Sequence, residues 1–483
     1  MKPNILLITT DQQRWDTLGI NGNSLIRTAF LDGLAARGTN FSRAYSTTPS
    51  CIAARRTLLT GQHGTTHGMV TFQGGVDFYP DYTVPGLLGA AGYQTQLIGK
   101  LHQHPQRKRY GFDHMILSDQ PDYRPNSPEY LQNDYVDWLK NTLGESTDPG
   151  VHGFGPNSRL ARPFHLGEAY HQTTWIAQEG AKFLLKQRDP ACPWFLHLSF
   201  CAPHPPLVPP QIYYDYYTRR EERWSPTLGD WCPKAAAPFG LEPDENTGPF
   251  DLEVMRNAMS GYYGLVDHID DSISFVLTRA FEYGATHDGQ PTWVIFTSDH
   301  GELLGDHHLF RKVLPYEGST HVPMFISSYG IDQAAISSDC VTCLEDVAPT
   351  ILEMAGVNIP DQVDGKSLLP IVEGRANSLG RDCLYGEHGG AQANHWIIRG
   401  NEKYIWYAAT HEEQLFDLGN DPGESKDLSG DTQRLEAYRR LLAKRLEHRS
   451  DYRFEIEKLT PANNKPPRIF WPADGSRTDQ KFT

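Results

Sequence analysis

Four short apolar runs constrain the fold of this chain more than any other feature of its sequence. Each is seven residues long and rich in branched and aromatic side chains, which is typical of strands buried on both faces of a parallel sheet. The runs are NILLITT (4–10), WFLHLSF (194–200), TWVIFTS (292–298) and VPMFISS (322–328). A long amphipathic helix is predicted before the third run, with an apolar face made by Met259, Tyr262, Val266, Ile269, Ile273, Val276 and Leu277. We therefore expect an α/β domain with a large, mostly parallel central sheet flanked by helices.

A change of pattern near residue 376 predicts a second, smaller domain. The chain has 483 residues, and a single hydrophobic core rarely grows beyond about 250 to 300 residues. After residue 375, the segments HWIIRG, KYIWYA and EQLFDL have the length of short strands joined by turns. A helix follows, with one apolar face made by Leu435, Tyr438, Leu442 and Leu446. We predict a large domain over 1–375 and a small α+β domain with an antiparallel sheet over 376–483.

Three segments lack the periodicity of core elements. Residues 103–165 and 205–250 are rich in proline, glycine and aromatic side chains, so we expect long loops that shape a pocket. The tail at 465–483 places Phe470 and Trp471 among prolines and turn formers. These two rings cannot form a core of their own, so we expect the tail to dock on the chain itself or on a neighbouring subunit of a homo-oligomer.

The charge and hydropathy of the chain argue against two kinds of partner. A net charge of −15 does not suit a nucleic-acid-binding surface, which needs clustered cations. No apolar run approaches the roughly 20 residues that span a bilayer. The first residues form too short an apolar run for a signal peptide, and seven scattered cysteines suit a reducing compartment, so we expect a cytoplasmic protein. We expect the pair Cys340 and Cys343 to be structurally inert.

Acidic residues follow two of the predicted strands. The first run ends at Asp11 and Gln12, and the third ends at Asp299 and His300. Open α/β sheets bind ligands at the carboxyl ends of their strands. Either aspartate alone would more commonly cap a turn or a helix. Two such ends, each with a second donor side chain, favour a site for a divalent metal.

The segment TTPSCIAARRTLLTG (47–61) places a cysteine at the predicted start of a helix. Ser50 and Gly61 are typical start and stop residues, so Cys51 would lie at the N-terminus, where free N–H groups and the helix dipole favour an anion. That position suits a nucleophile. The alternative is a buried, unreactive cysteine, the usual state of a free thiol. Two adjacent arginines, Arg55 and Arg56, are costly neighbours for a residue that only fills a core.

In this segment the chain resembles the sulfatase family of the alkaline-phosphatase superfamily. The family signature has Cys or Ser at its first position, any residue at the second, Pro at the third, Ser or Ala at the fourth and Arg at the fifth. Thr-Gly follows a few residues later. It stands here as Cys51-Ile-Ala-Ala-Arg55 with Thr60-Gly61. Six further segments follow the family order: ITTDQQ (8–13), GYQTQLIGKLH (92–102), APHPPLVPP (202–210), SDHGELLGDHHLFRKVLPYE (298–317), DVAPTILEMAG (346–356) and QLFDLGNDPGESKDL (414–428).

The resemblance implies a modified nucleophile beside a metal. Cys51 would be converted by a formylglycine-generating maturase to formylglycine, an aldehyde whose hydrate attacks the sulfate. One divalent ion, Ca²⁺ or Mn²⁺, would be held by Asp11, Gln12, the converted Cys51, Asp299 and His300. The substrate would be a small anionic ester, and the large domain over 1–375 would be the catalytic one.

The resemblance also implies roles for five further side chains. Arg55 would steady the hydrated aldehyde, while Lys100 and Lys312 would bind the sulfate oxygens. His102 would accept a proton from the second hydroxyl of the hydrate. His204 together with Lys312 would protonate the departing alkoxide or phenoxide.

Three departures from the family pattern matter. Ala53 replaces the signature proline, which the common aerobic maturase is expected to recognise. Gln12 and His300 stand where many sulfatases have Asp and Asn, and this set is similar to that of the related phosphonate monoester hydrolases and phosphodiesterases. A nitrogen ligand and fewer carboxylates favour manganese relative to calcium. His321 precedes Val-Pro where relatives often carry arginine.

Three functions therefore remain open. The first is hydrolysis of aryl, alkyl or carbohydrate sulfate esters, favoured because Lys100 and His102 keep the sulfatase pattern. The second is phosphonate monoester or phosphodiester hydrolysis at the same site. The third is a non-catalytic anion-binding protein in which Cys51 stays unconverted.

Overall fold

The computed structural model describes most of the chain. The described residues are 2–119, 132–220, 222, 224–232, 246–248, 250–282, 290–390, 393–408, 410–447, 449, 452–455 and 458–461. Within these ranges, no helix combines the length and the apolar character that a membrane crossing requires.

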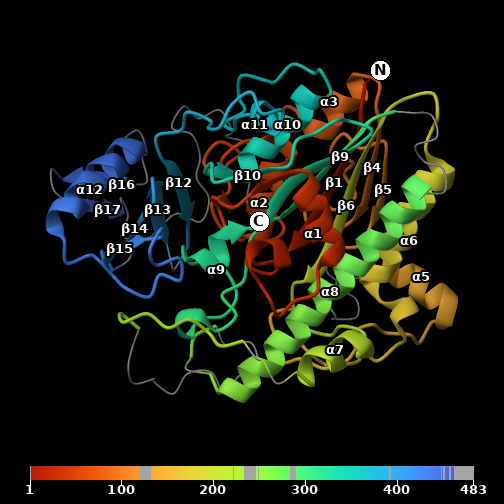
Figure 1. Cartoon of the computed structure of the whole chain (residues 1–483), viewed down its shortest axis with the longest axis horizontal. Coiled ribbons are helices and arrows are strands. Elements are labelled where there is room, and N and C mark those ends of the chain that lie inside the picture. Colours follow the sequence, from red (N-terminus) through yellow and green to blue (C-terminus); the bar gives the residue numbers. More distant parts are fainter. Residues whose placement is uncertain are drawn as a thin grey trace.

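An eight-stranded sheet runs through the middle of the molecule (Figure 1). Its strand order is β10-β2-β9-β7-β1-β6-β4-β5. The strands are β1 (Asn4–Asp11), β2 (Thr39–Phe41), β4 (Gln94–Gly99), β5 (His114–Leu117), β6 (Trp194–Pro203), β7 (Thr292–Ser298), β9 (Met324–Tyr329) and β10 (Ile336–Ser338). From β7 to β5 all neighbours are parallel. The predicted α/β class with a mostly parallel sheet is confirmed.

The fourth apolar run behaves differently from the other three. It forms β9, which pairs antiparallel with both β7 and β2. Parallel neighbours need a long crossover, usually a helix. The chain between β7 and β9 contains only short elements, namely a single 3-10 turn, α9 (Glu317–Thr320) and β8 (His321–Val322). An apolar run reports burial on both faces but not strand direction, so the sequence could not distinguish the two arrangements.

Helices cover both faces of the sheet because β1 buries alternate side chains on opposite sides. Leu6 and Ile8 belong to one apolar core, and Ile5 and Leu7 belong to the other. The first face is covered by α1 (Ala29–Arg37), α5 (Asp134–Leu143), α6 (Gln172–Lys182), α7 (Gln211–Thr218) and α8 (Leu252–Glu282). The second face is covered by α2 (Cys51–Thr60), α3 (Val84–Ala90), α10 (Val347–Met354) and α11 (Leu369–Val372).

Helix α8 confirms the strongest helical prediction. All seven predicted apolar positions are buried in the first core. Helix α5, by contrast, corrects the expectation that 103–165 is a loop region without core elements. Its Tyr135, Val136 and Leu139 pack into the same core, and β5 lies in the same segment. Helix α7 corrects the corresponding expectation for 205–250. These elements are short and surrounded by turn-forming residues, so their period does not stand out from the sequence.

A separate antiparallel sheet follows in the C-terminal part (Figure 1). It consists of β12 (Leu384–His388), β13 (Asn394–Arg399), β14 (Glu402–Tyr407) and β15 (Glu413–Asp417). Helix α12 (Thr432–Leu446) packs its predicted face of Leu435, Tyr438, Leu442 and Leu446 against this sheet. A strand pair, β16 (Tyr452–Glu455) and β17 (Lys458–Pro461), comes after α12. The domain boundary at 375/376 stays a prediction, and Phe470 and Trp471 lie outside the described residues.

A small three-stranded sheet completes the architecture. Strand β3 (Ala44–Tyr45) pairs with β11 (Thr342–Cys343) on one side and with β8 on the other. Strand β3 precedes α2 in the chain, and β8 follows the loop after β7. Their pairing places these two segments side by side. All seven cysteines are free thiols.

Candidate active site

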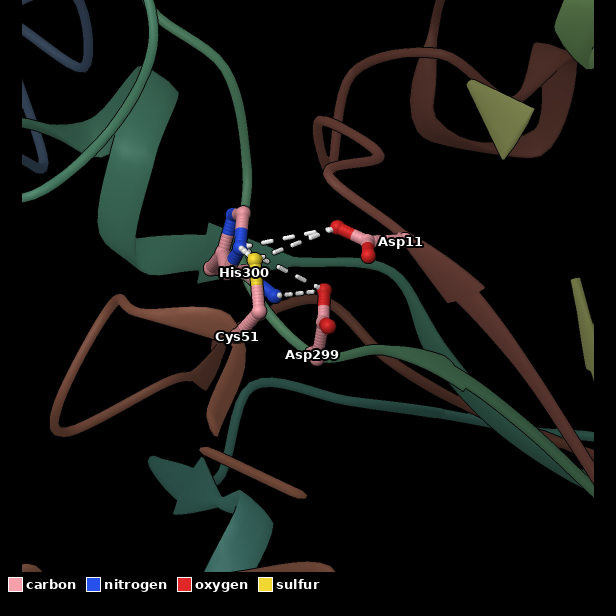
Figure 2. Close-up of side chains that lie close together, drawn as sticks. All are labelled: Asp11, Cys51, Asp299 and His300. Carbon is pink, nitrogen blue, oxygen red and sulfur yellow. Dashed lines mark hydrogen bonds and ion pairs between the residues drawn. The ribbon is translucent and has the colours of Figure 1, made fainter. Parts of the chain in front are cut away.

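The register of the central sheet brings the two acidic strand ends together. Strands β1 and β7 are parallel neighbours with Thr10 opposite Ser298, so Asp11 and Asp299 leave the same edge side by side. His300 follows at once, and α2 begins at Cys51 against this edge. Within the described residues, Asp11, Cys51, Asp299 and His300 form the one group of ionisable side chains whose ligand atoms all lie within 4.8 Å of one another. Figure 2 shows the four side chains converging from three segments of the chain.

Helix α2 has the predicted bounds. Ser50 is extended before its first turn, and Gly61 adopts the left-handed conformation (φ 72°) that ends it. The whole helix is buried, including both arginines. Arg56 has a structural role, because it donates to the carbonyl of Val76 at 2.8 Å and lies over the ring of Phe78.

The guanidinium of Arg55 binds groups in, or directly after, three strands of the sheet. Its Nε donates to Asp299 Oδ2 at 2.9 Å, and its Nη1 donates to the carbonyl of Lys100 at 3.0 Å and to Ser199 Oγ at 2.9 Å. Nη2 lies 3.7 Å from Asp11 Oδ2 and makes no hydrogen bond. Burial alone would lower the pKa of the guanidinium, but the carboxylates of Asp299 and Asp11 outweigh it and raise the pKa. Arg55 is therefore a permanent cation with one unused donor group.

The donor atoms of the cluster suit a divalent cation. His300 Nδ1 lies 3.0 Å from the carbonyl of Gly301, which can only accept, so Nδ1 carries a proton and Nε2 is the ring nitrogen that faces the cluster. Nε2 lies 3.6 Å from Asp11 Oδ1 and 3.7 Å from Asp299 Oδ1. Two carboxylates, an imidazole nitrogen and the side chain of residue 51 are a typical ligand set for a transition-metal ion.

The thiol of Cys51 is electrostatically activated. Sγ lies 3.0 Å from His300 Nε2 and 3.7 Å from Asp11 Oδ1. Burial and the Asp11 carboxylate raise its pKa, but the positive charges of Lys312, His300 and Lys100 outweigh them, so the pKa of the thiol is lowered. A buried, unreactive cysteine would have the opposite shift, as Cys201 does, where burial raises the pKa to about 12.

Lys100 is fully buried and pairs with Asp11. Its Nζ donates to Asp11 Oδ2, and its backbone N–H donates to the carbonyl of Ser199. Burial would raise the pKa of Asp11, but the ammonium of Lys100 and the guanidinium of Arg55 hold it well below its usual range. Asp11 is therefore ionised in this site.

Lys312 joins Gln12 to His204. Its Nζ donates to Gln12 Oε1 at 2.6 Å and to His204 Nε2 at 2.9 Å. His204 Nδ1 lies 2.8 Å from the carbonyl of Pro205, so the ring is protonated at Nδ1 and accepts at Nε2. Burial, followed by the charge of Lys312, holds the pKa of His204 well below its usual range. The ring is therefore neutral, and it accepts the hydrogen bond of the Lys312 ammonium.

His102 lies at the edge of the site with part of its surface exposed. Its backbone has a positive φ of 55°, and its N–H donates to Asp119 Oδ1 at 2.8 Å. The ring meets Phe72 edge-on, and Nδ1 makes no hydrogen bond within the described structure. Burial, followed by the nearby charge of Lys100, holds its pKa well below the usual range. His102 is thus a neutral ring with a free nitrogen, as a general base requires.

The structure therefore gathers all ten sequence-predicted site residues at one edge of the sheet. It also places residues there that sequence reasoning missed. Ser199 and Asp119 hold Arg55 and the His102 backbone. Glu302 accepts a hydrogen bond from Gln12 Nε2. Glu302 lies two residues after His300, and an acid so close to a metal-ligand motif is a signal that could have identified it.

Comparison with known proteins agrees with this geometry. The sulfatase family profile matches residues 3–357, and the profile for the C-terminal part of N-sulphoglucosamine sulphohydrolase matches residues 305–451. An arylsulfatase of Clostridium perfringens is 38% identical over 481 residues, which cover 95% of this chain and 97% of that protein.

Solved structures share the fold. The phosphonate monoester hydrolase of Agrobacterium radiobacter gives a TM-score of 0.75 at 24% identity, over 95% of this chain and 99% of that one. BT4656, solved in complex with its substrate D-glucosamine-2-N,6-O-disulfate, gives a TM-score of 0.73 at 20% identity, over 92% and 98%.

The chain therefore shares the fold of a phosphonate monoester hydrolase and of BT4656, and it gathers side chains of metal-ligand type at one edge of its sheet. The family match over most of the chain and the close arylsulfatase relative then narrow the class. The chain belongs to the sulfatase family, the sulfuric ester hydrolases.

Proposed function

We propose that this chain hydrolyses sulfate esters with an aldehyde made from Cys51 as its nucleophilic group. The observation that supports the proposal most is the place of Cys51, at the N-terminus of α2 and inside a buried set of two acids and a histidine. The identity of 38% to an arylsulfatase makes aryl sulfates the first substrate class to test.

Two groups would complete the site. A divalent cation held by Asp11, Gln12, Asp299, His300 and the converted Cys51 would supply Lewis-acid catalysis and orientation, and the nitrogen ligand favours Mn²⁺ over Ca²⁺. The hydrated aldehyde would supply the attacking oxygen. Arg55 would stabilise that hydrate through its unused Nη2.

Sulfate would be bound by the two lysines. An ammonium has three N–H donors, so Lys100 can hold Asp11 and a sulfate oxygen together. Lys312 has two acceptors within 2.9 Å, Gln12 Oε1 and His204 Nε2, and keeps a third donor for substrate. Charge-assisted donors in a dry site stabilise the charge that develops on the transferred group.

Proton transfer would be divided between the pair of Lys312 and His204 on one side and His102 on the other. Lys312 would give the proton to the departing alkoxide or phenoxide, and His204 would hold the ammonium in place through Nε2. On the other side, the free Nδ1 of His102 would accept the proton that leaves the nucleophile when sulfate is released.

A phosphonate monoester hydrolase or phosphodiesterase is the second candidate. The presence of Gln12 and His300 in the site favours it, and a phosphonate monoester hydrolase shares the fold. Lys100 and His102, the sulfatase-like pair, favour sulfate. A third candidate, an anion-binding protein with unconverted Cys51, follows from Ala53 in the signature.

The deciding experiment compares turnover of an aryl sulfate, an aryl phosphonate monoester and a phosphate diester by the same preparation. We expect the sulfate to give the largest kcat/KM. A larger value for the phosphonate would select the second candidate. Mass analysis of the tryptic peptide 44–55 measures the conversion of Cys51 in that preparation, so that absent turnover with full conversion would contradict both enzyme candidates. The maturase partner, the homo-oligomer and the cytoplasmic location remain predictions.

A further inference from the structure

The side-chain amide of Gln12 is buried with its two ends in different surroundings. Gln12 is completely inaccessible to solvent. Its Nε2 donates to Glu302 Oε2, and its Oε1 accepts from Lys312 Nζ at 2.6 Å. An amide has one donor end and one acceptor end of nearly equal size, so only its neighbours decide which end faces the acidic cluster.

Glu302 is placed so that it can only accept. Its Oε1 takes the backbone N–H of Leu304 at 2.8 Å and that of Arg311, while Oε2 takes the amide of Gln12. The residue is 1% exposed, so water does not compete. Its own carbonyl accepts from Arg14 Nη1 at 2.9 Å, which anchors the backbone below the carboxylate.

The backbone of Gln12 is equally constrained. It adopts a positive φ of 70°, its N–H donates to Asp299 Oδ1 at 3.1 Å, and its carbonyl accepts from the hydroxyl of Tyr262. The remaining freedom of the residue is rotation of its amide plane by half a turn. That rotation would set an amide oxygen against the Glu302 carboxylate and an NH₂ group against the Lys312 ammonium.

We propose that Glu302 is a positioning residue that turns the carbonyl oxygen of Gln12, rather than its NH₂ group, toward Lys312 and the cluster of Asp11 and Asp299. This inference rests on the proposed function, because only the carbonyl end can ligate a divalent cation. In the part of the chain that the structure describes, the carboxylate of Glu302 makes its hydrogen bonds to Gln12, Leu304 and Arg311 and none to the cluster. It acts through the amide it orients.

The test is a swap of nearly equal shape, read out by metal binding. Glu302→Gln keeps an oxygen for the two backbone donors but presents NH₂ to Gln12, which must then turn its own NH₂ toward Lys312. Chelator-treated protein titrated with Mn²⁺, with free Mn²⁺ measured by EPR, should bind roughly 10- to 100-fold more weakly than wild type, the range for lost ligand-orienting partners. In the background of Gln12→Glu, the same substitution should strengthen binding, because the amide introduced at position 302 can donate to the new carboxylate that Glu302 repels.

If Glu302 orients the amide of Gln12, Glu302→Gln weakens Mn²⁺ binding in the wild-type background and strengthens it in the Gln12→Glu background. If Glu302 only supported the loop from 302 to 311, the substitution would weaken binding in both backgrounds, and the inference would be overturned. Unchanged binding by Glu302→Gln would overturn it as well. Should that variant fail to fold, the comparison of Gln12→Glu with Gln12→Glu/Glu302→Gln still decides, since the proposal requires the double variant to bind more tightly.

The same titration separates this inference from the proposed function. If the wild type binds no Mn²⁺, or if Asp299→Ala binds Mn²⁺ as tightly as the wild type, the proposed metal site is wrong. The inference about Glu302 is then wrong as well. Wild-type protein that binds Mn²⁺ through Asp299 but shows no change of sign would overturn the inference alone.

Discussion

Two regions of the molecule bury a lysine among carboxylates, yet only one of them has the features of an active site. At the edge of the parallel sheet, Lys100 pairs with Asp11 next to Asp299. Where the C-terminal sheet meets the small sheet, Lys403 lies 2.9 Å from Glu317 and 3.0 Å from Glu424. Both lysines are completely buried.

The charged side chains of the second region pair with one another. Glu317 accepts from Lys403 through one oxygen and from His321 Nδ1 at 2.8 Å through the other, and its backbone N–H donates to Glu424 at 2.7 Å. His321 Nε2 faces the carbonyl of Ser42, and the ring stacks between Trp15 and Tyr45. Both ring nitrogens of His321 therefore face an acceptor, and the ring is held between two aromatic side chains.

The candidate active site at Asp11, Cys51, Asp299 and His300 has unpaired groups beside it instead. Arg55 Nη2, His102 Nδ1 and Thr10 Oγ1 make no hydrogen bond in the described structure. Unpaired buried atoms also occur elsewhere in the described structure, for example Ser319 Oγ and Trp396 Nε1, so they do not mark a site on their own. In this cluster they lie beside four side chains of metal-ligand type, and that combination indicates a site completed by a ligand. The comparison teaches that buried charge alone does not identify function.

The largest effect is expected from Cys51→Ala. Alanine is well tolerated at a helix start, so the fold should persist while turnover falls by at least about 10⁴-fold, as for loss of a nucleophile. The measurement is steady-state hydrolysis of an aryl sulfate together with thermal unfolding. Cys232→Ala, at a buried cysteine outside the cluster, is the matched control and should retain activity. Substantial turnover by Cys51→Ala would refute the nucleophile assignment.

Asp299→Ala should be the next most damaging change. It removes one of two carboxylates from the cation site and the partner of Arg55 Nε. We expect loss of bound metal and a fall in kcat/KM on the order of 10³-fold. Metal content per chain and kcat/KM are measured on the same sample, with chelated wild type for comparison. Normal metal content in this variant would show that Asp299 is not a ligand of the bound cation.

Lys403→Met tests the other side of the comparison. Removing one partner of a buried ion pair leaves uncompensated charge, so unfolding free energy should fall by about 3 to 5 kcal/mol. Turnover per folded molecule should change little. Urea unfolding and active-site titration measure the two quantities, and Lys444→Met, at an exposed site on α12, is the control. If Lys403→Met lost turnover without losing stability, Lys403 would not have the purely structural role assigned to it here.

The smallest effect concerns acid stability at a further structural ion pair. Arg449 Nη1 lies 2.7 Å from Glu387 Oε1. Burial would raise the pKa of Glu387, but the charges of Arg449, His395 and His63 outweigh it and lower the pKa to about 2. A depressed carboxyl pKa adds stability above the unfolded value near 4.3, and that stability is lost as the pH falls toward 2.

The corresponding variant is Glu387→Gln. From pH 5 to pH 2 the unfolding free energy of wild type should fall by up to about 3 kcal/mol more than that of the variant. Unfolding by urea at several pH values measures the difference. Parallel pH profiles for the two proteins would contradict the assigned ion pair.

Much of the fold and site could be predicted from sequence because short-range pattern carried the information. The apolar runs predicted β1, β6 and β7, and the acids after two of them predicted the strand edge where Asp11 and Asp299 meet. The antiparallel direction of β9 could not be predicted, since the burial pattern is the same for parallel and antiparallel strands. Helix α5 was missed because three buried side chains among turn formers leave a weak period.

By itself, the sequence determined the residue types, their spacing and the local elements: a cysteine at a helix start, acids after strands, and lysines and histidines in a family order. The tertiary structure alone decided which of these polar groups are paired. Lys403 and Glu317 are 86 residues apart, and Gln12 and Glu302 are 290 apart. Hydrogen bonds act over about 3 Å in space and carry no signature along the chain. Only the folded arrangement could therefore distinguish Lys403, which is paired with Glu317 and Glu424, from Lys100 and Lys312, which lie at the candidate active site.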